Sequence, residues 1–73
     1  MKEIKINEHH LMFDDNHNSL YHASEYLRDL PREESSKLFF KAKSGETAYF
    51  KDDHGVSLKL TRDGDSYIAT FAE

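Results

Sequence analysis

A group of histidines and aspartates near the start of the chain is the densest set of residues whose types could do chemistry. It comprises His9, His10, Asp14, Asp15, His17 and His22. Imidazole and carboxylate groups suit zinc, nickel and other transition metals as ligands. His10, His17 and His22, together with Asp14, would converge on one ion if the connection between them folded back. However, no two histidines have the four-residue spacing of a helical pair, and the spacing matches no closed zinc site. The pattern therefore favours a solvated loop whose histidines titrate near neutrality.

The three glycines argue against a nucleotide-binding loop or a cofactor fingerprint. Gly45 follows an expected helix, and Gly55 and Gly64 fall in expected hairpin turns. None is left for a loop that cradles phosphate, and the spacings of the known glycine-rich motifs are absent. Nucleophile-elbow and zinc-protease patterns are absent as well, and so short a chain has little room to enclose a substrate. We therefore expect a protein that is not an enzyme and that has no cofactor.

The 73 residues make a single domain, 1–73, near the lower size limit for a chain that buries its own core. There is no cysteine, so the sequence offers neither a disulfide nor a thiolate-bound metal. No apolar run has the length of a membrane span, and the first residues do not resemble an export signal. The expectation is a cytoplasmic protein without a membrane partner.

The charge of the chain argues against nucleic acid as the main partner. The formal net charge is −4 at pH 7. Residues 1–36 contain four Lys/Arg and eight Asp/Glu, which gives −4, and residues 37–73 contain six of each, which gives zero. An acidic chain repels a phosphate backbone over its surface as a whole.

Two amphipathic helices are expected in the middle of the chain. The first begins near Asn18 or Ser19, both good N-cap residues, and ends before Pro31. The second has Pro31 at its first helical position and ends at about Ser44, before Gly45. Apolar stripes at three- and four-residue spacing mark the buried side of each helix. These stripes are Leu20, Ala23, Leu27 and Leu30 in the first helix, and Ser35, Leu38, Phe39 and Ala42 in the second.

The segment from Glu46 to Ala72 predicts three antiparallel strands joined by two glycine-containing turns. Asp63-Gly64 suits a two-residue type I′ turn, and Asp53-His54-Gly55 suits a three-residue loop that ends in the left-handed region. These turns fix the register, which places one apolar side chain opposite another on a single face. The predicted facing pairs are Leu60 with Tyr67, Leu58 with Ala69, Val56 with Phe71, Phe50 with Leu58, and Ala48 with Leu60.

Alternation from Met1 to Asn7, with Ile4 and Ile6 on one side, predicts a further short strand at a sheet edge. The segment 11–13 either continues this strand or returns as a hairpin, and the pattern is compatible with both. The predicted fold class is α+β. It consists of a three- to four-stranded antiparallel sheet, made of the N-terminal strand and the C-terminal three-stranded meander, with two short helices packed on one face.

The sheet face turned away from the helices offers a candidate protein-binding surface. It is mostly polar, but Tyr49 and Ile68 are expected to flank Lys59 there. Tyrosine beside an exposed aliphatic side chain can anchor an interface. Tyr21, Tyr26 and Phe40, beside the helical stripes, offer a second patch. By elimination, we expect a small regulatory or accessory protein that binds another protein or forms a homodimer with a second copy of itself.

A weak nucleic-acid-binding module is the alternative function. The helix–helix–hairpin order invites comparison with winged-helix domains, with Lys37, Lys41 and Lys43 against a groove and the hairpin as a wing. The same lysines are also typical of the solvated face and C-terminal end of an ordinary helix. Aspartates at both hairpin tips would face the phosphates, and no basic stripe emerges, so the second interpretation is favoured. These aspartates are Asp52, Asp53, Asp63 and Asp65.

Overall fold

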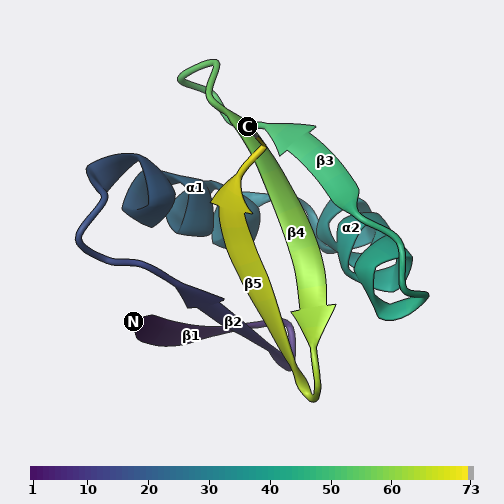
Figure 1. Ribbon diagram of the computed structural model, residues 1–73. Coiled ribbons are helices and arrows are strands. Elements are labelled where there is room, and N and C mark those ends of the chain that lie inside the picture. Colours follow the sequence, from purple (N-terminus) through teal and green to yellow (C-terminus); the bar gives the residue numbers. More distant parts are fainter. Residues whose placement is uncertain (73) are drawn as a thin grey trace.

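The protein consists of one β-sheet with two helices packed on one of its faces, as the computed structural model in Figure 1 shows. The structure describes residues 1–72. Within them the elements in chain order are β1 (Lys2–Ile6), β2 (His9–Phe13), α1 (Asn18–Asp29), α2 (Arg32–Lys43), β3 (Ala48–Lys51), β4 (Ser57–Asp63) and β5 (Ser66–Phe71). The α+β class is therefore confirmed.

The sheet is larger than the sequence predicts and is mixed rather than antiparallel. Over residues 1–72 its five strands lie in the order β1-β2-β5-β4-β3. Antiparallel pairing joins β1 to β2, β5 to β4 and β4 to β3, but β2 and β5 run parallel to each other. The expectation of three or four antiparallel strands is wrong on this point. The chain leaves β2 and passes through α1, α2, β3 and β4 before it returns as β5, and a long crossover of this kind permits parallel pairing.

The N-terminal segment forms a hairpin, which is one of the two arrangements that its sequence allows. Ile6 pairs with His9, so Asn7 and Glu8 form a two-residue loop between β1 and β2. Both loop residues have positive φ, 48° at Asn7 and 77° at Glu8, as a type I′ turn requires. The Asn7 side chain also donates a 3.0 Å hydrogen bond to the hydroxyl of Ser35 in α2. This contact ties the turn to the helical layer.

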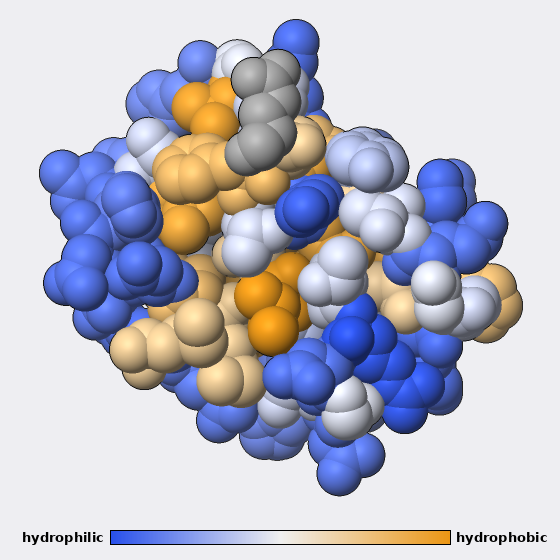
Figure 2. All heavy atoms as spheres, viewed as in Figure 1, coloured by the Kyte–Doolittle hydropathy of each residue, from blue (hydrophilic) through white to orange (hydrophobic). Residues whose placement is uncertain are grey.

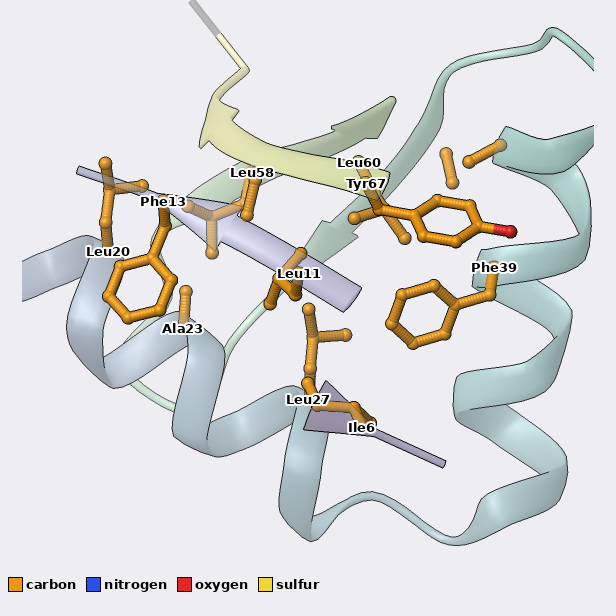
Figure 3. Close-up of a cluster of buried hydrophobic side chains, with 13 residues drawn as sticks. Ile6, Leu11, Phe13, Leu20, Ala23, Leu27, Phe39, Leu58, Leu60 and Tyr67 are labelled. Atoms are coloured by element: carbon orange, nitrogen blue, oxygen red, sulfur yellow. The ribbon is translucent and has the colours of Figure 1, made fainter. Parts of the chain in front are cut away.

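The hydrophobic core is a single layer between the sheet and the helices (Figure 3). The strands and the helices both contribute to it, and Leu11, Phe13 and Leu58 are fully buried in its middle. The predicted helical stripes are buried except at their margins, where Leu30 and Leu38 are only partly covered. The buried apolar residues are Ile6, Leu11, Phe13, Leu20, Ala23, Leu27, Phe39, Ala42, Ala48, Leu58, Leu60, Tyr67 and Ala69.

The register of the meander is confirmed on one side and wrong on the other. Phe50 pairs with Leu58 and Ala48 with Leu60, as predicted. Between β4 and β5 the pairing is shifted by two residues, so that Leu60 faces Ala69 rather than Tyr67. The observed pairs on this side are Leu58 with Phe71, Leu60 with Ala69, Arg62 with Tyr67, and Asp63 with Ser66.

The shift arises at the β4–β5 turn, where the two loop residues are Gly64 and Asp65 rather than Asp63 and Gly64. Gly64 has a φ of 63°, and neither aspartate has a positive φ. This is the pattern of a type II′ turn, which places glycine first and asks no other residue for a positive φ. A type I′ turn at Asp63-Gly64 would require a positive φ at Asp63 as well as at Gly64. Because the shift is an even number of residues, every strand side chain keeps its predicted face.

Each helix starts at a slightly different residue from the one that the sequence predicts. Asp14 begins a turn, with its carbonyl accepting from the His17 amide at 3.2 Å, and α1 starts directly after it with His17 as N-cap. Pro31 is the N-cap of α2 rather than its first residue. Neither of the helices in residues 1–72 is long and apolar enough to cross a membrane.

Replacing Glu8 by glycine tests the strain in the β1–β2 turn. Glycine takes a positive φ without steric cost, and Asn-Gly is a preferred pair for type I′ turns. We expect Glu8→Gly to raise the free energy of unfolding by about 0.5–1 kcal/mol in urea denaturation. The matched control is Glu3→Gly within β1, which should lower it because glycine weakens a strand. A lower stability for Glu8→Gly would contradict the turn assignment.

Candidate functional site

One whole face of the sheet carries no helix in the described part of the chain, and this open face is the first candidate site. Because side chains alternate along each strand, the residues between the buried ones all point to it. Figure 2 shows apolar atoms reaching the surface in several places among polar ones, with hydrophilic residues along much of the rim. The open face carries Met12 from β2, Tyr49 from β3, Lys59 and Thr61 from β4, and Ile68 and Thr70 from β5.

The observed register rearranges the predicted group on the open face. Lys59 pairs with Tyr49 on one side, as expected, but with Thr70 on the other. Ile68 pairs instead with Thr61 and, across the parallel contact, with Met12. The prediction that Tyr49 and Ile68 flank Lys59 is therefore wrong for Ile68. The face has a tyrosine–lysine pair toward β3 and a separate isoleucine–methionine pair toward β2.

Phe40 and Tyr26 do not belong to the open face. Phe40 lies in α2, on the helical layer, and is 71% exposed. Tyr26 lies in α1 and is half-buried, with its ring parallel to that of Phe50 at a centroid distance of 6.5 Å. The residues predicted to bind protein are thus divided between the two layers.

An open hollow adjoins Tyr49 near the end of the β3–β4 hairpin. Its volume is about 500 Å³. Both faces of the hairpin contribute, because Phe50 and Leu58 come from the buried side and Tyr49 from the open side. β3 is also an edge strand of the sheet, so its outer backbone groups are not paired with another strand of residues 1–72. The lining residues are Tyr49, Phe50, Lys51, Ser57, Leu58 and Ala72.

The predicted metal ligands are distributed over three places. His10 lies in β2 with Nδ1 3.8 Å from a carboxylate oxygen of Glu3. His17 lies before α1 with Nε2 3.7 Å from a carboxylate oxygen of Asp14. His22 lies within α1 and is directed elsewhere, toward the β3–β4 loop. Across residues 1–72 no three histidine, aspartate or glutamate side chains are already grouped as ligands of one ion.

His9, which the sequence groups with the metal candidates, belongs to an aromatic cluster at the edge of the core. Its ring stacks on Phe39 with a centroid distance of 4.3 Å and an interplanar angle of 14°. Tyr67 meets the same ring edge-on at 5.4 Å. Burial lowers the pKa of His9 below 6.5, aided by Lys43 and Arg32 and opposed by Glu8. The signal in the sequence was the alternation of His9 with Leu11 and Phe13, which places all three on one face.

The predicted nucleic-acid residues are exposed on α2. The side chains of Lys37, Lys41 and Lys43 are all exposed to solvent. The carbonyl oxygen of Lys43 accepts a 3.3 Å hydrogen bond from the Arg62 guanidinium, which ties the end of α2 to the β4–β5 turn. The acidic residues at the hairpin tips are not all exposed as expected, because Asp52 is only 6% exposed.

Asp52 holds the β3–β4 loop in shape. One oxygen of its carboxylate accepts the backbone N–H groups of His54 at 2.9 Å and Val56 at 3.0 Å. The backbone closes the same loop, since the amide of Gly55 donates to the Asp52 carbonyl at 3.1 Å. Gly55 has a φ of 79°, so the predicted three-residue loop with a left-handed glycine is confirmed. The other carboxylate oxygen is buried and has no hydrogen-bond partner among residues 1–72.

A second, polar cavity lies between α1 and this loop and has a volume of about 240 Å³. Its lining combines two histidines, three carboxylates and one tyrosine, namely His22, Glu25, Tyr26, Asp29, Asp53 and His54. Sequence reasoning missed this group because its two halves are far apart in the chain. A partial signal was present, since the four residues of α1 follow a three- and four-residue spacing and so share one side of the helix.

The comparisons with known proteins do not assign the chain to a class. No family model, no curated protein and no solved structure matches the chain.

Removing the Asp52 carboxylate tests whether it holds the β3–β4 loop. Asp52→Ala leaves two loop N–H groups without their acceptor, and we expect the free energy of unfolding in urea to fall by about 1–3 kcal/mol. Asp53→Ala is the matched control. That side chain is 71% exposed, so the change should stay within about 0.5 kcal/mol. Equal effects of the two substitutions would refute the role of Asp52.

The His9 ring predicts a pH-dependent stability with a defined sign. Its pKa in the folded state lies below the ordinary value of 6.5, so folding favours the neutral ring. The neutral His9 ring therefore stabilises the folded state. This stabilisation is fully present above pH 6.5 and is lost as the pH falls through that value toward the folded-state pKa. We therefore expect the wild type to lose stability relative to His9→Phe below pH 6.5 in urea denaturation at several pH values. Parallel pH curves for the two proteins would contradict this.

Proposed function

We propose that this protein is a cytoplasmic, non-catalytic binding module, and that its partner is another protein that docks on the open face of the sheet. The proposal rests on one observation, which is that helices cover only one face of the sheet. Both helices pack on the same face, while the other face carries Tyr49, Ile68 and Met12 at the surface. A sheet face that no helix covers is normally polar, and adjacent apolar side chains on it are typical of an interaction site.

Tyr49 is the proposed anchor of the interface. It is 64% exposed and pairs with the half-buried Lys59, so it lies on a paired strand rather than on a loop. A rigid aromatic side chain loses little conformational entropy on binding, and tyrosine is enriched among residues that dominate binding energy. The hollow next to Tyr49 at the free edge of β3 offers a recess for a partner side chain.

Ile68 and Met12 form the second part of the proposed interface. They pair directly across the β2–β5 contact, so they present one continuous apolar spot near the centre of the sheet. Polar and charged side chains, including Glu3, Lys5 and Lys51, surround the face toward its edges. An apolar centre with a polar rim is the common anatomy of a protein–protein interface.

The experiment compares partner capture by the wild type with capture by Tyr49→Ala and Ile68→Ser, using native cell extract and purified chain. Self-association is followed in parallel by analytical ultracentrifugation. We expect each substitution to weaken binding at least tenfold, about 1.4 kcal/mol, while the circular dichroism spectrum stays unchanged. Phe40→Ala is the matched control, because Phe40 is equally exposed but lies on the helical layer. Binding that survives both open-face substitutions, or that is lost with Phe40→Ala instead, would refute the proposed face.

A further inference from the structure

The polar cavity between α1 and the β3–β4 loop brings together two histidines that are far apart in the chain. The His22 and His54 rings have centroids 5.1 Å apart, with an angle of 55° between their planes. His22 projects from a regular helix, and His54 from a loop of three residues. Asp53 lies next to His54 in the same cavity, with its carboxylate 3.9 Å from Nε2 of His54.

We propose that this cavity binds a transition-metal dication such as Zn²⁺, with the imidazoles of His22 and His54 and the carboxylate of Asp53 as its ligands. Two histidines and one carboxylate, with water in the fourth position, are a ligand set that zinc commonly takes. The set differs from the one that the sequence indicates, because only His22 is common to both.

The spacing of the two rings fits a shared metal ion. A Zn–N bond of about 2.1 Å places each ring centroid about 3.2 Å from the metal. Two such ligands at a tetrahedral angle then have centroids about 5.2 Å apart. The observed separation is 5.1 Å. The separation of the two ring centroids therefore matches the one that joint coordination requires.

The third ligand requires only a small movement. Two ligand atoms on a tetrahedral zinc ion are about 3.4 Å apart, and the Asp53 carboxylate is 3.9 Å from Nε2 of His54. The side chains of Asp53 and His54 are 71% and 60% exposed, so both have room to rotate. In residues 1–72 no three ligands converge on one point, so the proposed site requires the Asp53 side chain to rotate toward His22.

The charges around the cavity favour a cation. Glu25, Asp29 and Asp53 line it, and the Arg28 side chain, whose guanidinium is 3.5 Å from the Glu25 carboxylate, offsets only one of these negative charges. The uncompensated carboxylates lower the energy of a dication in the cavity and raise that of an anion.

The two histidines are also positioned by rigid parts of the fold. Leu20, Ala23 and Leu27 are buried and hold α1 against the core. They therefore fix the position of the backbone from which His22 projects. Asp52 accepts the backbone N–H of His54 and so fixes the loop. A metal ion between them would cross-link the helical layer to the hairpin loop, and it would stabilise the folded state because it binds that state preferentially.

The test is a titration of the full chain with Zn²⁺ at about pH 7.5, followed by isothermal calorimetry and by thermal unfolding. We expect one ion per chain and a rise in melting temperature with Zn²⁺ concentration. His22→Ala, His54→Ala and Asp53→Asn should each weaken binding at least tenfold. Binding should also weaken on acidification, because protons compete with the metal for the imidazoles.

His10→Ala and His17→Ala are the matched controls. Each removes one partly exposed histidine of the same type, and both lie away from the cavity. They should leave Zn²⁺ affinity unchanged. The proposal is overturned by three results: no binding to the wild type, undiminished binding to His54→Ala in a folded protein, or an equal loss in the control variants.

Discussion

The structure depends on the amount of apolar side chain that a chain of 73 residues can place between two layers. Thirteen buried apolar residues fill the space between the sheet and the two helices of residues 1–72. A second helical layer on the opposite face would need a comparable set of apolar side chains, and small domains are limited in how much surface they bury. The sheet is therefore sealed on one side only, and the other side must be compatible with water or with a partner.

The parallel contact between β2 and β5 makes one sheet of two separate units. An N-terminal hairpin and a C-terminal meander are each held by local turns, but only three residue pairs join them. On one face this contact places Leu11 against Tyr67 in the core, and on the other it places Met12 against Ile68. Ordering the long intervening chain costs conformational entropy, which the shared core offsets. The apolar spot on the open face is a direct product of this contact.

The β3–β4 hairpin links the two candidate sites. Its strands present Tyr49 to the open face, and its loop presents His54 to the cavity beside α1. Both positions depend on the turn that Asp52 holds through its two accepted hydrogen bonds. Burying a carboxylate is costly, and one oxygen of Asp52 has no hydrogen-bond partner within the described residues. The Asp52 carboxylate thus fixes the shape of the loop, although its burial costs free energy.

The sequence by itself determined the two helices, the three C-terminal strands and the side to which each residue of those strands points. Turn-forming glycines, helix stripes and alternation act between near neighbours, so Gly55, Leu58 and Phe39 have the local environments that their spacing predicts. The tertiary structure alone decided which distant segments meet. Periodicity predicts the face on which His9 and His22 lie, but it does not predict the β2–β5 pairing, the stacking of His9 on Phe39 or the approach of His22 to His54. They follow from how the two layers close over a common core, and that closure depends on the shapes of all the buried side chains together.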